Sequence, residues 1–517
     1  MVNLSIFTTR KHAPAADAVN EAGGRAYALS DKHALAQYAA TGCLSNTFYT
    51  TGQGQLDAVR ALVGKVNGEF VAKAAVYTRQ HSHMKDMPAL LLAELASRDG
   101  ELLEKVFGRV CDNGKMLRNF VQIVRSGATG RRSLGSRPKR LVRQWLDRRS
   151  DAQVFGDSVG NDPALTDVLR MVHPKPATDA RRALYGYLLG RQHDAAALPE
   201  CVRTFEDFKA GRSDQVPDVP FQLLTGSPLR ESAWRAIASR AGWQMLRMNL
   251  NTFLRHGVFD DAALTKALAK KLAAPEEVRK ARVFPYQLLM AYKQADTKVP
   301  KKIRDALHDA MEAAIHNVPE VDGQIYVLLD VSGSMHSPVT GHRQGATTAV
   351  RCIDAAALVA AAFLRKNRDT EVIPFHDKVV PCKIDGHDSV LTNAQRLAKL
   401  PSGGTNCAVP LQELNRRKAK GDLVIFVSDN ESWIDTRSTY RRGTQVMEEW
   451  GVFKRRNPGA QLVCIDIQPG ATTQAPDRKD ILNVGGFSDD VFSLVAAFAR
   501  GGLAGEHWVR AIEAITL

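Results

Sequence analysis

The sequence lacks the cysteine spacing of a zinc site or of a disulfide framework. Among 517 residues there are only seven cysteines, an odd number, and none of them forms a CxxC pair or a Cys/His cluster. Few and scattered cysteines are typical of reducing compartments, where thiols act mostly as small buried apolar groups. We therefore expect a cytoplasmic chain without disulfides.

Long apolar runs are missing as well. The longest such stretches, for example residues 355–364, are far short of the roughly 20 residues that a membrane helix needs. The first 19 residues lack the apolar core of a signal peptide. These absences argue against a membrane partner.

Catalytic and nucleotide-binding signatures are also absent. The chain has no G-x-S-x-G nucleophile elbow and no phosphate-binding P-loop, and its glycine-rich run at 402–406 does not follow the P-loop pattern. It has no zinc finger, basic zipper or RNP aromatic signature either. We expect a binding protein and not an enzyme.

The chain has an ordinary globular composition, and its sequence pattern changes once along its length. Hydrophobic residues make up 44% and charged residues 24% of it, and its length exceeds the limit of about 250–300 residues for one core. Amphipathic helical segments run to about residue 318, and short β-rich runs alternate with helices afterwards. The predicted fold class is therefore mainly α plus α/β, with one domain at 1–318 and a second at 319–517.

The helical half is recognised by its apolar period. In the segment 114–127, apolar residues recur at the spacing of a helix with one buried face. Further helices are expected at 55–66, 69–80, 89–97, 232–241, 243–257, 263–273 and 285–295. Many short helices in a row suggest a solenoid-like domain, although no repeat of fixed length is present.

The second half has the pattern of a parallel sheet. Four apolar runs alternate with helical stretches at 345–367 and 443–456, as in sheets that helices cover on both faces. The expected strands are 324–332, 371–380, 422–430 and 461–467. We therefore expect a doubly wound α/β domain.

The net charge of +15 is unevenly distributed. Residues 319–517 contain 23 basic and 23 acidic side chains, which leaves 47 basic and 32 acidic ones, and the whole surplus, in residues 1–318. A basic surplus attracts polyanions. We therefore expect the helical half to meet such a partner.

Three loops of the α/β half carry oxygen-bearing side chains. Asp330, Ser332 and Ser334 follow the first strand as D-x-S-x-S, Thr405 lies in the Gly-rich loop, and Asp429 ends the strand LVIFV. Hard oxygens at the carboxyl ends of parallel strands suit Mg²⁺ or another divalent ion. Strand-end capping and turn formation are the alternative explanation.

The three loops resemble the metal-ion-dependent adhesion site of a von Willebrand factor A domain. The resemblance implies that Asp330, Ser332, Ser334 and Thr405 coordinate or orient the ion, and that Asp429 often acts through water. Such sites usually complete the ion with a carboxylate from a partner, so the ion could bind weakly alone.

One segment of the helical half is unusually basic. Residues 125–149 hold nine basic residues against the single Asp147. Within it we expect one helix with an apolar stripe on one face and arginines on another, where their planar forks can hold phosphates. A solvated charged face is the plainer alternative; the charge partition favours nucleic acid. The candidate RNA-binding residues are Arg125, Arg131, Arg132, Arg137, Lys139, Arg140 and Arg143.

The order of these features resembles the Ro ribonucleoprotein family, in which a helical TROVE module precedes an A domain. The resemblance covers about residues 40–517. It is carried by GCLSNTFY (42–49), MVHPKP (171–176), LLTGSPLRESAWRAI (223–237), KARVFPYQLLMAY (280–292), DVSGSM (330–335), GGTNCAVPL (403–411), VSDNES (427–432) and a GGFSDDVFSLVAAF segment near the C-terminus.

The resemblance implies HEAT-like helical repeats closed into a ring, with the A domain joining the ends. It further implies a monomer that binds small noncoding (Y-like) RNAs on its outer surface and single-stranded 3′ ends of misfolded or decaying RNAs in its hole. An exoribonuclease would be its protein partner, and RNA quality control its role. A Trp-Ser-His-x-Asp stretch usual in the family is replaced here by residues 161–167, which puts that RNA contact in doubt. His173 matches a later family histidine, for which a packed or turn-capping role is an alternative.

A second class of function stays open. The A domain could instead bind an acidic motif through Mg²⁺, which would make the chain a protein–protein adaptor on a basic helical scaffold. A metal hydrolase is a third, weaker alternative.

Overall fold

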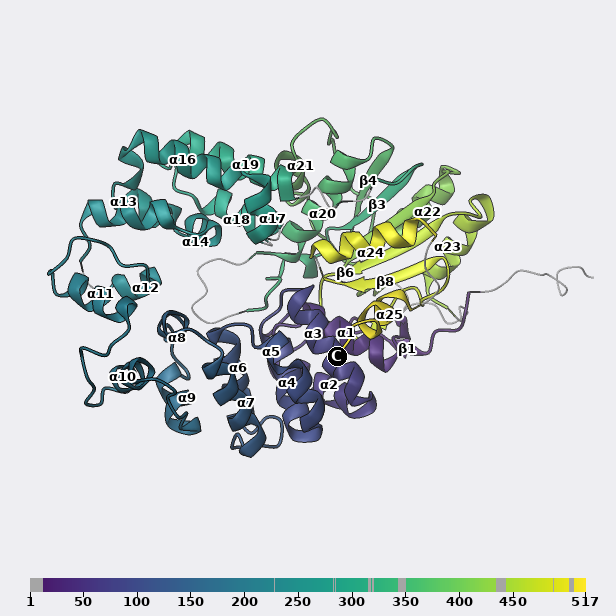
Figure 1. The fold of residues 1–517 in the computed structure, drawn as a ribbon. Coiled ribbons are helices and arrows are strands. Elements are labelled where there is room, and N and C mark those ends of the chain that lie inside the picture. The colour runs from purple at the N-terminus through teal and green to yellow at the C-terminus, as the bar shows by residue number, and fades with distance from the viewer. Residues whose placement is uncertain are drawn as a thin grey trace, which may run out of the picture. The chain divides into compact units, whose positions relative to one another are not determined.

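The computed structural model divides into two compact units (Figure 1). It describes residues 13–226, 228–281, 283, 285–314, 318, 320–342, 350–433, 443–486, 488–501 and 506–517. Unit 1 is Met1–Val66 with Ile315–Ala514, and unit 2 is Asn67–Ala314 with Ile515–Leu517. The change of unit at residue 315 lies close to the expected domain boundary at 318/319. The first 66 residues, which the sequence analysis placed with the helical half, belong to unit 1.

A five-stranded parallel sheet forms the centre of unit 1. Its strands are β3 (Ile325–Asp330), β4 (Thr370–Phe375), β5 (Leu423–Ser428), β6 (Gln461–Asp466) and β8 (Ile481–Gly485), in the order β4-β3-β5-β6-β8. The chain leaves β3 for β4 on one side and then crosses to β5 on the other. This change of direction makes the carboxyl end of β3 a topological switch point, where sheets of this kind bind ligands.

Helices cover both faces of this sheet. On one face Leu328 and Phe426 share an apolar cluster with Trp450 and Phe453 of α23, and on the other α20 packs against β3 and β5. The unit-1 helices are α1 (Asp31–Thr41), α2 (Gly52–Lys65), α20 (Cys352–Lys366), α21 (Val390–Leu397), α22 (Val409–Arg416), α23 (Gln445–Arg456), α24 (Asp489–Ala499) and α25 (His507–Glu513). The doubly wound fold is thereby confirmed. The expected helix at 345–367 is described only from Val350 onward.

The N-terminal segment extends unit 1 beyond the sheet. Strands β1 (Ala18–Val19) and β2 (Arg25–Ala28) form a small antiparallel sheet with β7 (Thr472–Thr473), in which Tyr27 pairs with Thr473. Helix α1 is almost wholly buried, and its Gln37 donates a 3.0 Å hydrogen bond to the carbonyl of Gln468. Residues 13–66 are therefore part of the α/β unit.

Unit 2 is built of short helices that pack on their neighbours along the chain. Helix α3 contacts α4 and α5, α4 contacts α6, and α16 contacts α19. The helices are α3 (Gly68–Gln80), α4 (Asp86–Arg98), α5 (Gly100–Val110), α6 (Gly114–Arg125), α7 (Ser136–Asp147), α8 (Asp151–Asp157), α9 (Leu165–Val172), α10 (Asp179–Leu188), α11 (Glu200–Lys209), α12 (Phe221–Leu224), α13 (Glu231–Arg240), α14 (Trp243–Met248), α15 (Leu250–Arg255), α16 (Ala262–Ala273), α17 (Pro275–Ala281), α18 (Pro285–Gln294) and α19 (Lys301–Ala314).

The predicted apolar faces of α6 and α7 are buried as expected. Met116, Phe120 and Val124 of α6 are all buried, as are Leu141 and Trp145 of α7. The helix expected at 243–257 is instead two helices, α14 and α15, because Asn249 between them has ψ 17° and leaves the helical conformation. The expected mainly α plus α/β fold class is confirmed, while the closure of the helical half into a ring stays a prediction.

Two other expectations concern thiols and membranes. All seven cysteines are free thiols, and five of them are buried. Within the part of the chain that the structure describes, none of the helices combines the length and apolar content needed to cross a bilayer.

Candidate metal centre and basic helical surface

The D-x-S-x-S turn lies at the switch point of the sheet and is buried. Asp330 ends β3 with its side chain fully enclosed, and its Oδ1 accepts a 2.8 Å hydrogen bond from the Ser332 backbone. The Oγ atoms of Ser332 and Ser334 are 3.2 Å apart. The turn thus gathers one carboxylate and two hydroxyls, as the spacing predicted.

Two glycines bring the second loop against the first. A Cβ at Gly403 would lie 2.6 Å from His376 Nδ1, and a Cβ at Gly404 would lie 2.7 Å from Trp433 Nε1, so neither position has room for a side chain. The Gly333 backbone N–H donates a 3.0 Å hydrogen bond to the Gly403 carbonyl. Thr405 follows directly and is buried, 5% exposed.

The third loop, which follows β5 and contains Asp429, is hydrogen-bonded to the other two loops. Ser428 donates a 2.6 Å hydrogen bond to Asp330 Oδ2, and the Trp433 backbone donates to the Thr405 carbonyl at 3.3 Å. Asp429, also 5% exposed, lies close enough to Ser334 for that hydroxyl to lower its pKa. The structure therefore brings the three predicted loops together.

The assembled loops concentrate negative charge away from water. Burial and, second, the charge of Asp330 raise the pKa of Asp429 to about 7. Burial also raises the pKa of Asp330, although hydrogen bonds from Ser428 and Ser332 oppose that shift. Burial and the charge of Asp429 raise the pKa of Glu431, which follows closely, to about 8. A nearby cation would stabilise all three carboxylates in their charged forms.

The donor set fits a divalent ion of the Mg²⁺ type. Asp429 Oδ2 is buried and has no hydrogen-bond partner, which is costly for a carboxylate oxygen unless a cation faces it. Carboxylate and hydroxyl oxygens are the ligands that Mg²⁺ and Mn²⁺ prefer. Among the described residues no group of three or more His, Cys, Asp or Glu side chains could hold a metal, so this site depends on its hydroxyls.

The candidate RNA-binding residues differ in whether their side chains are already bonded within the protein. Arg131 donates a 2.6 Å hydrogen bond to the Ala96 carbonyl, and Arg143 donates to the carbonyl of Val172 at the end of α9. Arg140 forms a 2.6 Å ion pair with Glu104, with both side chains about half exposed. Arg131 and Arg143 therefore have structural contacts, whereas the Arg140 pair lies in solvent, where such pairs contribute little.

The remaining candidates form no ion pair with any described residue. Arg125 and Arg132 are exposed, Lys139 is half-buried, and exposed Arg137 lies against Gly100 at the start of α5. Arg125 and Arg132 are thus the candidates best placed to meet a phosphate.

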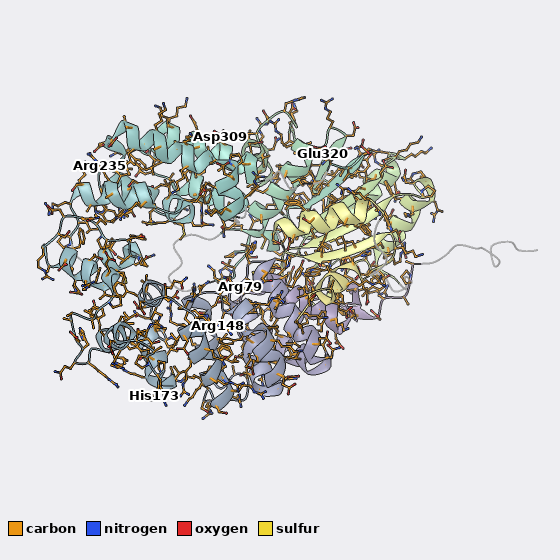
Figure 2. All side chains as sticks on the ribbon, in the orientation of Figure 1. Arg79, Arg148, His173, Arg235, Asp309 and Glu320 are labelled. Carbon is orange, nitrogen blue, oxygen red and sulfur yellow. The ribbon has the colours of Figure 1, made fainter. Side chains whose placement is uncertain are left out.

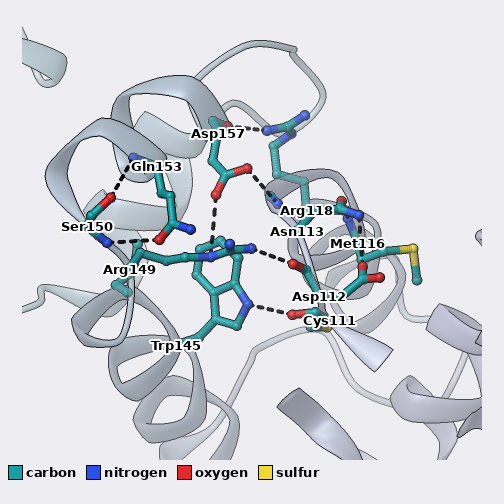
Figure 3. A network of polar contacts seen from close by, with 12 residues as sticks. Cys111, Asp112, Asn113, Met116, Arg118, Trp145, Arg149, Ser150, Gln153 and Asp157 are labelled. Carbon is teal, nitrogen blue, oxygen red and sulfur yellow. Dashed lines mark hydrogen bonds and ion pairs between the residues drawn. The ribbon is translucent and has the colours of Figure 1, made fainter. Parts of the chain in front are cut away.

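Arg148 and Arg149, which follow α7, differ in their exposure and in their contacts. Arg149 lies 4.3 Å above the Trp145 ring, donates a 2.6 Å hydrogen bond to the Asp112 carbonyl, and is 3.6 Å from Asp157 (Figure 3). It joins α7 to the loop before α6 and to α8. Arg148, labelled in Figure 2, is exposed and makes no such bonds in the described chain. Arg148 therefore joins Arg125 and Arg132 as an available cation.

The family histidine occupies a helix end. His173 terminates α9 in the left-handed conformation with φ 48°, and its side chain is exposed (Figure 2). The position at the helix end is therefore as expected, whereas a packed ring was wrong because the side chain is exposed; a contact of the ring with RNA stays a prediction.

Residues at the metal centre were missed by the sequence analysis. Ser428 and Glu431 lie beside Asp429 in the sequence, but only the fold shows that Ser428 bonds to Asp330. Burial and, second, the charge of Asp429 also raise the pKa of Tyr49, which lies nearly 300 residues before the D-x-S-x-S turn. Only its place in the GCLSNTFY run could have drawn attention to it.

The net charge can be counted again for the two units that the structure defines. Unit 1 holds 29 basic and 27 acidic residues, and unit 2 holds 41 basic and 28 acidic ones. Unit 2 therefore carries +13 of the net charge, and the basic segment 125–149 lies within it.

Comparisons with known proteins agree with this architecture. Residues 324–499 match the family model described as the Ro60 vWA domain. The chain is 25% identical to a Deinococcus radiodurans protein named RNA-binding protein RO60, over 93% of this chain and 95% of that one. A Caenorhabditis elegans protein of the same name is also 25% identical, over 45% of this chain and 36% of its own length.

A solved structure shares the fold. The crystal structure of the Deinococcus radiodurans Ro protein matches 92% of this chain and the whole of that one, with a TM-score of 0.61 and 22% identity. The helical half, the A domain and their order are common to both. The chain is therefore similar to Ro proteins along nearly its whole length, and its residues 324–499 match the A domain described for them.

Proposed function

We propose that the protein binds RNA through exposed arginines of unit 2 and acts as a binding platform without catalysis of its own. The observation that carries the proposal is a set of three exposed arginines, Arg125, Arg132 and Arg148, which have no ion partner among the described residues and lie in a unit of charge +13. Guanidinium groups hold phosphate oxygens in pairs of charge-assisted hydrogen bonds. The two relatives that carry the name RNA-binding protein RO60 support the same function.

The proposed RNAs are small noncoding, Y-like molecules and the single-stranded 3′ ends of misfolded or decaying RNAs. In this proposal the protein presents such ends to an exoribonuclease in RNA quality control. The support is the resemblance to the Ro family together with the basic segment, which continues from the end of α6 through α7.

A gel-shift comparison tests this function. The probes are a small RNA hairpin with a single-stranded 3′ tail, the same hairpin without a tail, and duplex DNA of equal length. We expect the tailed hairpin to bind most tightly. Equal binding of all three would reduce the proposal to a general polyanion surface, and an absence of binding at low salt would refute it.

A second candidate function is a Mg²⁺-dependent protein adaptor. It is favoured by the buried, unpartnered Asp429 Oδ2 next to Asp330 and the two serine hydroxyls. In this proposal the centre holds a divalent ion through Asp330, Ser332, Ser334, Thr405 and Asp429, and the ion receives a carboxylate from a partner protein.

Purification from cells distinguishes the two functions. A preparation that carries RNA, and whose protein partners are lost on ribonuclease treatment, supports the platform. A preparation free of RNA, with partners released by a chelator, supports the adaptor.

A further inference from the structure

A groove of about 400 Å³ lies between α5 and α7 of unit 2 and reaches the start of α8. Its floor is apolar, because Phe107, Leu141 and Trp145 line it, and all three side chains are buried. Pockets that bind small molecules have volumes of about 300–1,000 Å³ and a mostly apolar lining. The groove therefore has the size and the floor for one flat ring system that carries a few polar groups.

A glycine keeps this groove open. Gly108 is exposed on α5 and lines the groove, and a Cβ there would lie 3.8 Å from Arg148 Nη1, an ordinary van der Waals distance. The position therefore has room for a side chain, although glycine weakens a helix relative to alanine. A larger residue at Gly108 would strengthen α5 and fill the groove.

The floor of the groove is fixed by polar contacts behind it (Figure 3). Trp145 Nε1 donates a 2.5 Å hydrogen bond to the Cys111 carbonyl, and Arg149 lies 4.3 Å above the indole ring. Arg149 is itself held by its 2.6 Å hydrogen bond to the Asp112 carbonyl. Because the indole is already held in place, little side-chain entropy would be lost when a ligand binds.

Two side chains at the end of α7 offer polar groups to the groove. Gln144 and Arg148 are four residues apart on one face of the helix, and both are exposed and line the groove. Neither side chain forms a hydrogen bond or an ion pair with any described residue. An amide can donate and accept at the edge of a base, and a guanidinium can hold two phosphate oxygens.

The acidic side chains of the groove are already paired. Glu104 forms its 2.6 Å ion pair with Arg140, and the Asp112 carboxylate accepts hydrogen bonds of 2.8 to 3.1 Å from Arg79. Among the described residues that line the groove, Arg148 is then a cation without an ion partner. One phosphate charge matches it, whereas the several charges of a triphosphate would meet two carboxylates nearby.

We infer that this groove binds one unstacked nucleotide of an RNA, with its base on the apolar floor, its base edge at Gln144 and its phosphate at Arg148. The inference rests on the RNA-binding function proposed above and names a subsite for it. Unstacked bases are the part of an RNA that proteins read most specifically, whereas a base inside a duplex stack cannot enter a pocket. Since a glutamine amide forms two hydrogen bonds with adenine, we expect adenine to be preferred.

The test is calorimetry of the full-length chain with adenosine 5′-monophosphate and with ribose 5-phosphate, which lacks the base. Ribose 5-phosphate should bind about tenfold more weakly. Gly108→Leu should weaken adenosine 5′-monophosphate binding about tenfold by filling the groove, with a melting temperature equal to or above that of the wild type. The matched control Gly451→Leu makes the same change on α23, where a Cβ also has room, and should leave the affinity unchanged.

Gln144→Ala separates the contact with the base from the shape and charge of the groove. It keeps Gly108 and Arg148, so it should weaken binding of adenosine 5′-monophosphate about fivefold or more and leave that of ribose 5-phosphate unchanged. If Gly108→Leu and Gln144→Ala both bind adenosine 5′-monophosphate like the wild type, the inference is wrong. It is also wrong if the wild type binds both probes equally tightly.

RNA hairpins distinguish failure of the inference from failure of the proposed function. Gly108→Leu should bind a hairpin with an oligoadenosine 3′ tail more weakly than the wild type does, and a hairpin without a tail equally well. If the wild type and Gly108→Leu bind the tailed hairpin equally tightly, the RNA-binding function stands and the role of the groove is refuted. If the wild type binds neither hairpin, the RNA-binding function fails and the inference falls with it.

Discussion

Arg148 and Arg149 show that adjacent residues of one type can serve different ends. The Arg149 guanidinium is bonded to the Asp112 carbonyl and lies on Trp145, whereas Arg148 is exposed. Sequence alone marks both as members of a basic run. The distinction depends on a carbonyl 37 residues away, which no local pattern reveals.

The first prediction compares these two residues. Arg149→Ala should lower the free energy of unfolding by about 1–3 kcal/mol, because it removes a hydrogen bond, a cation–π contact and an ion pair. Arg148→Ala should change it by less than about 0.5 kcal/mol, as is usual for exposed side chains. Urea denaturation of both variants measures the difference, and equal effects would contradict the structural role of Arg149.

A second prediction concerns the buried carboxylates in chelator. The pKa values of Asp429 (about 7) and Glu431 (about 8) lie above those of unfolded chains, near 4. Between about pH 5 and pH 8 the folded chain therefore binds more protons than the unfolded one, and the free energy of unfolding should fall as pH rises. Urea denaturation across this range measures the slope.

Asp429→Asn is the control for this slope. It removes one of the titrating groups, so in chelator it should be more stable than the wild type near pH 8 and should depend less on pH. It should also lose any stabilisation by Mg²⁺. A wild-type stability that is flat or rises between pH 5 and pH 8 would contradict the electrostatics described here.

At the scale of elements, the N-terminal strands lie against the third loop of the metal centre. Asn20 Nδ2 donates a 3.0 Å hydrogen bond to the Ser432 carbonyl, and the Ala22 backbone donates to Glu431 at 3.2 Å. A Cβ at Gly24 would lie 2.1 Å from the Ser432 carbonyl oxygen. The turn between β1 and β2 therefore depends on a residue without a side chain.

Gly24→Ala should consequently destabilise unit 1. The added methyl group would push the β1–β2 turn away from the third loop, at a cost of about 1–3 kcal/mol, and should weaken Mn²⁺ binding. Gly451→Ala is the matched control, since a Cβ there meets nothing within 4 Å in the middle of α23 and should be neutral or stabilising. Thermal melts and Mn²⁺ titrations compare the two, and a Gly24→Ala chain that behaves like Gly451→Ala would contradict the contact.

Much of the element order could be predicted from the sequence, and the failures have physical reasons. The four long apolar runs correspond to β3, β4, β5 and β6, because strands buried on both faces leave an unmistakable apolar signature. Strand β8, with the sequence ILNVG, was not predicted. It is short, and its apolar run is interrupted by Asn483, whose side chain bonds to Ala475 and Asp477. The two-residue strand β1 pairs with the short β2, and β2 pairs with β7 more than 400 residues away; no local pattern indicates that second pairing.

The candidate sites were predictable to different degrees. Asp330, Ser332, Ser334 and Asp429 could be named because parallel strands place their following loops at one edge of the sheet. Thr405, in the loop between α21 and α22, was named through the resemblance to an A domain. The sequence shows that the segment 125–149 is basic. It does not show that some of its arginines bond to Ala96, Val172 or Asp112, because those bonds depend on how the helices pack.

At the scale of the whole molecule, the basic surplus and the candidate metal centre belong to different units. Unit 1 is nearly neutral at +2 and contains the buried carboxylates, while unit 2 carries +13. Arg125 ends α6, Arg132 lies in the loop between α6 and α7, and Arg148 follows α7, whereas the candidate metal centre lies at the switch point of the sheet. The central claim is that the exposed arginines of unit 2 contact RNA phosphates.

The salt dependence of RNA binding tests that claim most directly. Each phosphate contact to single-stranded RNA adds about −0.7 to the slope of log affinity against log salt. The variant R125Q/R132Q/R148Q should bind at least tenfold more weakly at low salt, with a slope reduced by roughly 2 for three lost contacts. The control R182Q/R212Q/R230Q removes the same charge from arginines already paired with Asp179, Asp207 and Asp214. The account predicts wild-type affinity and slope for the control; equal losses in both variants, or none in either, would contradict it.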